Sequence, residues 1–314
     1  MGQQTSGAYR SGILFGLVAY VWWGLVPLYF REVKHVPAAE ILAHRIVWSV
    51  VLLAGLTALI GGWADLRRVL TARRLVLTLL LSSVLLAGNW LMYIYATVTG
   101  RVTEASLGYY MMPLVNAFLA TVFLGERLRP AQYPALALVA VGVALPFIVA
   151  GEFTWLAVAL PVTFGFYGLV RKRVAVDSLT GLTVESLLLA VPSAGYLAWA
   201  GVAGKGSFGP DWRLNGLLMF GGVVTVVPLL TFTLSLRRLP LLAVSFIQFL
   251  SPTVQFFLAV YLFGEPMPPE RWAAIGCVWA AVAIFVADAA WQAHTRRTAV
   301  EVIPSAPVLA TSGR

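Results

Sequence analysis

Long apolar segments, separated by short polar loops, occupy nearly the whole chain. A transmembrane α-helix needs roughly 20 apolar residues, because each residue rises about 1.5 Å across a hydrocarbon core of about 30 Å. The segments lack the alternation of apolar and polar residues that marks barrel strands, so helices are the remaining spanning structure. The pattern predicts an all-α membrane protein with ten transmembrane helices, over residues 11–30, 40–62, 75–98, 104–124, 133–150, 154–170, 181–201, 214–236, 240–263 and 272–291.

The composition agrees with a chain whose surface faces lipid. Hydrophobic residues make up 60% of the 314 residues and charged residues only 11%. Soluble domains carry about 25% charged residues, because their surfaces must face water. A soluble globular domain is therefore excluded.

The basic residues are concentrated in the loops on the side of the N-terminus. This placement accounts for the net charge of +9 without a nucleic-acid partner, and the positive-inside rule predicts that both termini are cytoplasmic. On that side lie Arg10, Arg67, Arg68, Arg73, Arg74, Arg127, Arg129, Arg171, Lys172, Arg173, Arg237, Arg238, Arg296, Arg297 and Arg314, whereas the opposite loops hold only Arg31, Lys34, Arg101, Lys205, Arg213 and Arg271.

No motif of an enzyme or a metal site is found in the sequence. Cys277 is the only cysteine, and the three histidines, His35, His44 and His294, are too scattered to hold a metal. A Gly-rich phosphate loop is absent, which argues against ATP as the direct energy source. We expect no catalytic residues, no metal and no cofactor, with an integral-membrane enzyme as the minor alternative.

An internal repeat divides the chain into two halves. The stretch SLGYYMMPLVNAFLATVFLGERLRP (106–130) aligns without gaps to SFIQFLSPTVQFFLAVYLFGEPMPP (245–269), and the two prolines and the two Gly-Glu pairs coincide. A weaker similarity links WGLV (23–26) to YGLV (167–170), at a slightly different offset. The repeat predicts a five-span half over 1–150, a second over 151–291, and a disordered cytoplasmic tail over 292–314.

Because five is odd, the second half must enter the membrane from the opposite side. Two inverted five-helix repeats are typical of secondary transporters, whose substrate site lies near the midplane between the repeats. Channels and passive scaffolds also arise by duplication, and they stay open as alternatives.

The repeat also indicates candidate site residues. Tyr109, Pro113 and Asn116 align with Gln248, Pro252 and Gln255, and spacings of three and four place each set on one helix face. A proline removes the hydrogen bond to the carbonyl four residues earlier, so Pro113 and Pro252 are expected to break their helices and free the carbonyls of Tyr109 and Gln248. The freed carbonyls and the polar side chains beside them would then form the wall of a cavity. The alternative is a proline kink whose polar residues hydrogen-bond between helices.

Aromatic and amide side chains elsewhere are expected to complete the wall of this cavity. Asn89, Trp90 and Tyr93 lie in the third span, with Asn89 and Tyr93 on one face, and Tyr167 lies in the sixth. Trp22 and Trp23 lie in the first span. Such side chains suit amphipathic organic molecules, through stacking and a few hydrogen bonds.

Ionisable residues within spans are costly and are functional candidates by default. His44 and Arg45 lie near the start of the second span, with Glu40 one turn before His44. We expect this group to bind an anionic group or gate the outer mouth, with an interfacial ion pair as the alternative. Glu104 and Glu185 are weaker candidates for proton coupling.

Several segments together resemble the RarD proteins, a branch of the EamA family within the drug/metabolite transporter superfamily. They are AEILAHRIVWS (39–49), GNWLMYIYA (88–96), EASLGYYMMPLVN (104–116), FYGLVRK (166–172), VPLLTF (227–232) and IQFLSPT (247–253). The resemblance implies ten spans, inverted repeats, a permease of the bacterial plasma membrane and a cavity bounded mainly by spans one, three, four, six, eight and nine. Met112 departs from it, because Asn is expected before the proline.

The function predicted from these observations is alternating-access transport of a small organic metabolite or drug. The partners are then a small-molecule substrate and the lipid bilayer, and a homodimer stays open. The rival functions are a channel or passive facilitator and a membrane protein of assembly or regulation.

Overall fold

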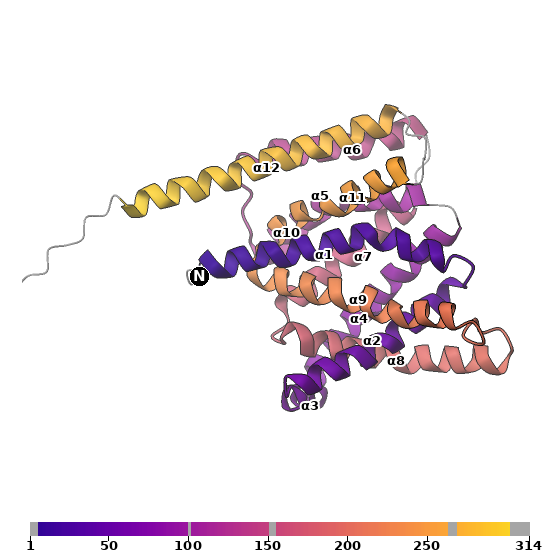
Figure 1. The fold of residues 1–314 in the computed structure, drawn as a ribbon. Coiled ribbons are helices and arrows are strands. Elements are labelled where there is room, and N and C mark those ends of the chain that lie inside the picture. Colours follow the sequence, from indigo (N-terminus) through magenta and orange to yellow (C-terminus); the bar gives the residue numbers. More distant parts are fainter. Residues whose placement is uncertain (1–5, 100–101, 151–154, 263–268, 302–314) are drawn as a thin grey trace, which may run out of the picture.

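The computed structural model describes residues 6–99, 102–150, 155–262 and 269–301, all within an arrangement of helices (Figure 1). The long helices are α1 (Ser6–Glu32), α2 (Ala38–Leu59), α4 (Arg73–Val98), α5 (Val102–Leu124), α6 (Gln132–Ala150), α7 (Trp155–Arg173), α8 (Ser178–Val202), α9 (Trp212–Arg238) and α12 (Pro269–Glu301). The shorter ones are α3 (Trp63–Thr71), α10 (Leu241–Ile247), α11 (Leu250–Phe257) and the π-helix η1 (Leu258–Leu262).

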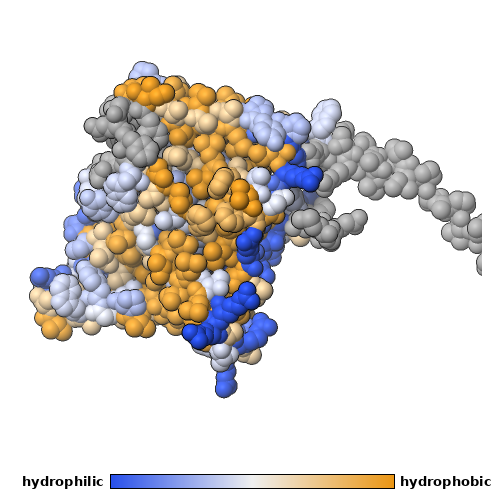
Figure 2. All heavy atoms as spheres, turned by 180° about the vertical axis from the view of Figure 1, so that it is seen from behind, coloured by the Kyte–Doolittle hydropathy of each residue, from blue (hydrophilic) through white to orange (hydrophobic). Residues whose placement is uncertain are grey.

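Within the described residues, six segments are long and apolar enough to cross a membrane: α1, α2, α4, α8, α9 and the stretch from α10 to η1. Shorter apolar helices lie within α5, α6 and α12. The surface in Figure 2 has a broad hydrophobic band, with most of the strongly hydrophilic residues at one end of the molecule and a few at the opposite end. This distribution is that of a bundle surrounded by lipid.

The structure differs from the sequence-based expectation at three places. The loop expected after the second span contains α3, which buries Leu66 and Val69. The predicted span 240–263 is interrupted between α10 and α11 and ends in η1. The predicted disordered tail is wrong for its first part, because α12 continues to Glu301; residues 302–314 lie outside the described part of the chain.

The helices pack on one another in a connected set. Helix α9 packs between α1 and α2, α7 packs between α4 and α5, and α2 also contacts α8. Helices α6 and α12 pack on each other along one edge, where α5 joins them to the rest (Figure 1). We call the end where α1 begins the N-terminal end and the opposite end the distal end.

Candidate substrate site

A cavity of about 690 Å³, including any part open to solvent, lies among six helices near the middle of the bundle. It is lined by Tyr20, Trp23, Val26 and Phe30 of α1, Arg45 of α2, Asn89, Trp90 and Tyr93 of α4, Tyr109 of α5, Phe164 of α7, Gln248 between α10 and α11, and Ser251, Pro252 and Gln255 of α11.

Among the described residues of the cavity wall, Arg45 is the one that carries a charge. It lies about two turns into α2 from the distal end and is 4% exposed. Its Nε donates to Thr225 Oγ1 at 2.9 Å, and its guanidinium carbon lies 4.7 Å from the Trp90 ring centroid and 5.6 Å from that of Phe30. The cation is therefore held against aromatic faces.

The amide side chains of the cavity already hold neighbouring helices together. Asn89 Nδ2 donates to the carbonyl oxygen of Leu160 at 2.8 Å and to Thr163 Oγ1 at 3.0 Å, which ties α4 to α7. Gln255 Nε2 donates to the Trp23 carbonyl oxygen at 3.3 Å, which ties α11 to α1. Each amide keeps its carbonyl oxygen as a further acceptor.

Gln248 lies where the ninth predicted span is interrupted, and its side chain accepts a 3.5 Å hydrogen bond from the hydroxyl of Tyr20. The expectation that Pro252 frees the Gln248 carbonyl is wrong, because that oxygen accepts from the Ser251 N–H at 3.0 Å. A tighter turn thus replaces the missing bond. The polar side chain of Gln248, rather than its backbone, faces the cavity.

Three predicted site residues are not on the cavity wall. Asn116 is buried where α5 meets α7, and its Oδ1 lies 3.2 Å from the place that a Cβ on Gly165 would take. Tyr167 is buried among aromatic rings. Pro113 lies inside α5, which continues through it, and Pro252 lies inside α11, so the predicted break is at neither proline; the interruption lies before Pro252, between Ile247 and Leu250.

Glu40 and His44 also lie away from the cavity wall. They form a pair at 3.8 Å between Glu40 Oε1 and His44 Nε2, as their spacing predicts. The Glu40 carboxylate accepts from Ser207, from its N–H at 2.5 Å and its hydroxyl at 2.8 Å, and the His44 ring stacks on Phe208 at 5.3 Å. Both side chains hold the loop between α8 and α9.

An aromatic cluster lies beside the cavity and includes three of its wall residues, Tyr20, Trp23 and Phe164. Phe232 of α9 contacts the rings of Tyr20 at 6.1 Å, Phe164 at 5.2 Å and Tyr167 at 6.2 Å between centroids. Trp23 joins it, 5.6 Å from Phe164. We call Tyr20, Trp23, Phe164, Tyr167 and Phe232 the aromatic cluster; it brings α1, α7 and α9 together.

A buried ion pair lies nearer the N-terminal end. Arg171 Nε of α7 lies 3.7 Å from Glu185 Oε1 of α8, and both side chains are 1% exposed. Ser82 of α4 hydrogen-bonds to the Glu185 carboxylate, and the hydroxyl of Tyr167 is within electrostatic range of both charges. These contacts join α4, α7 and α8.

The sequence reading missed Tyr20, Val26, Phe30, Phe164 and Ser251 as wall residues. The spacing of Tyr20, Trp23, Val26 and Phe30 is a usable signal, since steps of three and four place all four on one face of α1. The expected lining also needs correction, because α9 supplies no wall residue and α2 supplies Arg45.

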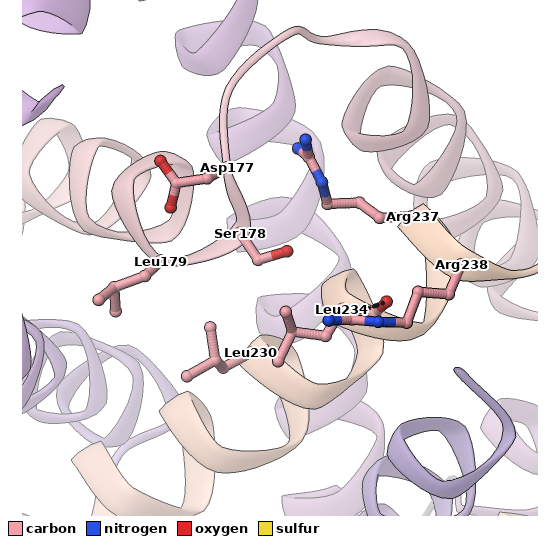
Figure 3. A pocket seen from close by; sticks show the side chains of 7 residues that line it. All are labelled: Asp177, Ser178, Leu179, Leu230, Leu234, Arg237 and Arg238. Carbon is pink, nitrogen blue, oxygen red and sulfur yellow. Dashed lines mark hydrogen bonds between the residues drawn. The ribbon is translucent and has the colours of Figure 1, made fainter. Parts of the chain in front are cut away.

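A second hollow lies at the N-terminal end, between the start of α8 and the end of α9 (Figure 3). Arg237 donates there to the carbonyl oxygen of Val176, and Arg238 donates to the Leu234 carbonyl oxygen at 3.0 Å. None of the predicted site residues lines this hollow. The central cavity is therefore the candidate substrate site.

Comparison with known sequences agrees with this architecture. A model of the "EamA-like transporter family" matches residues 10–148. "Protein RarD" of Salmonella typhi is 41% identical over 281 residues, which cover 89% of this chain and 96% of the relative. The chain belongs to the RarD branch of the EamA-like transporter family. It is thus a multi-pass membrane protein.

Other members of the family are similar along nearly their whole length. "Protein RarD" of Escherichia coli K12 is 39% identical, with 92% of this chain and 97% of the relative covered. An "Uncharacterized transporter" of Vibrio cholerae is 41% identical, covering 92% and 96%. A solved crystal structure that is 20% identical superposes with a TM-score of 0.67 over 87% of this chain and 96% of its own, and so shares the fold.

Proposed function

We propose that this chain is a secondary transporter that carries a small organic metabolite or drug across the bacterial plasma membrane by alternating access, without a catalytic step. The observation that carries the proposal is the central cavity, whose wall residues come from both halves of the sequence. Its aromatic rings and uncommitted amide oxygens suit an organic solute. The fold of an EamA-like transporter supports the same function.

The packing of the helices supports two inverted halves in which α1, α2, α4 and α5 correspond to α7, α8, α9 and the α10–η1 segment. The contact of α1 with α9 is matched by that of α7 with α4, and the contact of α2 with α9 by that of α8 with α4. Likewise α5 packs on α7 as α11 packs on α1. A pseudo-two-fold relation between the halves produces such matched pairs.

Close glycine contacts support the same relation at the level of residues. A Cβ on Gly24 of α1 would lie 2.6 Å from Val254 Cβ, and a Cβ on Gly165 of α7 would lie 3.0 Å from Val115 Cγ1. Val115 and Val254 are aligned in the internal repeat. The contacts therefore favour pairing Gly24 with Gly165, one helical turn away from the WGLV and YGLV similarity.

We further propose that the N-terminal end is cytoplasmic. The start of α1 and the end of α12 lie at this end (Figure 1), and so do the basic last turns of α7 and α9. Basic residues are retained on the cytoplasmic side of a membrane. In this orientation Arg45 lies toward the outside and the Arg171–Glu185 pair toward the cytoplasm.

Uptake into liposomes tests the proposal. Purified protein is first screened by thermal shift against amino acids, nucleosides, organic acids and phenicols, and each ligand is then measured as saturable uptake and counterflow. Phenicols are included because one relative, from Pseudomonas aeruginosa, is named "Chloramphenicol-sensitive protein RarD". Varying the pH and Na⁺ gradients in the same liposomes identifies the driving ion.

Wall variants separate the proposal from its rivals. Gln248→Ala and Tyr109→Phe should raise KM for uptake, because both side chains line the cavity. Flux that does not saturate and tolerates both changes would indicate a channel. No flux and no ligand stabilisation would indicate an assembly or regulatory protein.

A further inference from the structure

Arg45 is a buried cation without a carboxylate partner among the described residues. Its one hydrogen bond there joins Nε to the neutral Thr225 hydroxyl, and no described carboxylate oxygen lies within 4.0 Å of the guanidinium. The acid nearest along α2, Glu40, is engaged by Ser207 and His44. The terminal nitrogens of Arg45 are thus free to bind a ligand.

Other buried basic residues of the bundle have acidic partners. The buried Arg171 has Glu185 at 3.7 Å, and the half-buried Lys172 has Glu126 at 3.9 Å as well as two carbonyl oxygens, those of Leu236 and Leu239. A buried charge without a partner is expensive, and aromatic faces compensate only part of its lost hydration. A purely structural role, joining α2 to α9, would be served at less cost by a neutral side chain.

We propose that the cavity selects solutes with a single carboxylate, that Arg45 binds this group, and that the aromatic wall receives an apolar or aromatic body. This assignment rests on the proposed transport function and deepens it. Arginine presents two parallel donors that match the two oxygens of a carboxylate. Tyr93 and Tyr109, which line the same wall within electrostatic range of Arg45, are available as further donors.

The charge of the cavity argues for a monoanion over other classes of solute. A phosphate monoester carries close to two negative charges, whereas the described part of the wall supplies one cation. The ammonium of an amino acid would meet no carboxylate among the described wall residues, and its best aromatic partner, Trp90, already contacts Arg45. A neutral solute would leave Arg45 without an opposite charge.

The body of the solute has a matching surface. Trp23, Phe30 and Phe164 line the cavity together with Val26 and Trp90. Rings in such a wall can stack on an aromatic body or meet it edge to face. The combination of one cation and an aromatic wall therefore selects aryl and alkyl monocarboxylates.

The test uses matched ligands on the full-length wild-type protein in detergent. Phenylacetate, benzoate and hexanoate are compared with their primary amides, and with phenylalanine and phenyl phosphate, by thermal shift and isothermal calorimetry. We expect the carboxylates to bind at least about tenfold more tightly than their amides, the advantage of a charge-assisted hydrogen bond. An amide, amino acid or phosphate that binds as tightly as its matched carboxylate would overturn the proposal, and so would failure of every carboxylate to bind.

Variants locate the effect. Arg45→Gln should remove the difference between acid and amide, Arg45→Lys should keep part of it, and Arg213→Gln, an exposed change at the distal end, should keep all of it. Retention of the full difference in Arg45→Gln contradicts the assignment. The comparison of acids with amides on the wild-type protein tests the proposal without any variant. The proposal therefore stays falsifiable even if a variant does not fold.

The two proposals fail in different ways. Saturable uptake of neutral or zwitterionic solutes, with no preference for carboxylates, would refute the role of Arg45 and leave the transporter function intact. Specific carboxylate binding without any flux into liposomes would refute transport and keep Arg45 as a ligand-binding residue.

Discussion

Arg45 and Glu185 stand at the same distance from the starts of α2 and α8, helices that correspond in the proposed repeat. Arg45 donates a hydrogen bond to the hydroxyl of Thr225 in α9, and the carboxylate of Glu185 accepts one from the hydroxyl of Ser82 in α4. Helices α4 and α9 also correspond in the proposed repeat. The surroundings of the two side chains then differ. Glu185 has a cation, Arg171, at 3.7 Å, whereas Arg45 faces a cavity and aromatic rings.

This difference shows how corresponding positions of one architecture can hold a compensated ion pair toward one end and, toward the other, a cation on a cavity wall without a described carboxylate partner. A buried pair whose charges compensate each other contributes to packing and leaves nothing for a ligand. A buried charge whose compensation is incomplete is a place where a ligand of opposite charge gains the most. Four substitutions test the comparison, in order of decreasing effect on stability.

The largest loss of stability is expected at the Arg171–Glu185 pair. Glu185→Gln removes the acidic partner of Arg171 and should lower the free energy of unfolding by about 3–5 kcal/mol, the usual cost of leaving one member of a buried pair. Thermal unfolding in detergent measures it. Asp65→Asn, in the exposed Arg68–Asp65 pair, is the control, and an equal shift in both variants would show that the buried pair is unimportant.

The next effect concerns the space that Arg171 occupies. A Cβ on Gly181 would lie 2.7 Å from the guanidinium carbon of Arg171, so Gly181→Ala should displace that side chain and destabilise the protein by about 1–3 kcal/mol. Gly195→Ala, on the same helix with no atom within 4 Å of its Cβ, should be neutral or stabilising. Equal melting temperatures for the two variants would mean that the Arg171 side chain can adopt another position without loss of stability.

Arg45 should matter little for folding. Arg45→Gln loses the contacts with Trp90 and Thr225 but also removes a buried charge without a carboxylate partner, so we expect a change of under about 1 kcal/mol in the free energy of unfolding. The same thermal measurement checks it. A loss as large as that of Glu185→Gln would make Arg45 a structural residue and end the contrast between the two ends.

The smallest effect is expected on the surface. Arg213 pairs with Glu32 at 2.6 Å, but the two side chains are 71% and 44% exposed. Because water screens such pairs, Arg213→Gln should change stability by about 0.5 kcal/mol or less, which sets the baseline for the other variants. A larger shift would show that this pair contributes to folding.

Much of the helix pattern could be predicted from apolar run length, and the reasons for the exceptions are physical. The short α3 has two buried apolar residues among several charged ones, and such a helix resembles a loop in composition. Pro113 and Pro252 are the same residue in aligned segments, yet only the second lies beside an interruption. The outcome depends on what packs around each proline, which a single sequence does not contain.

The sequence predicted a cavity with aromatic and amide walls, but it did not identify all of the residues that form them. The internal repeat, helical spacing and residue type identified six residues that line the cavity: Asn89, Trp90, Tyr93, Tyr109, Gln248 and Gln255. Asn116 shares the helix face of Tyr109 in α5 but contacts α7 instead of the cavity. One face of a helix is wide enough to line a cavity on one side and to pack on a neighbouring helix on the other. For Arg45, the sequence shows the buried charge, whereas the lack of a carboxylate partner depends on the positions of residues far along the chain.

The interruption of the ninth span has a mechanical consequence. Its start is held by Glu126, whose carboxylate accepts from the N–H groups of Leu241 and Leu242, at 2.9 and 3.3 Å. Its next part is held where Val254 meets Gly24. Between these two anchors lies Gln248, at the interruption and on the cavity wall. Under the proposed alternating access, a bend of the segment at this point would move a side chain that lines the cavity.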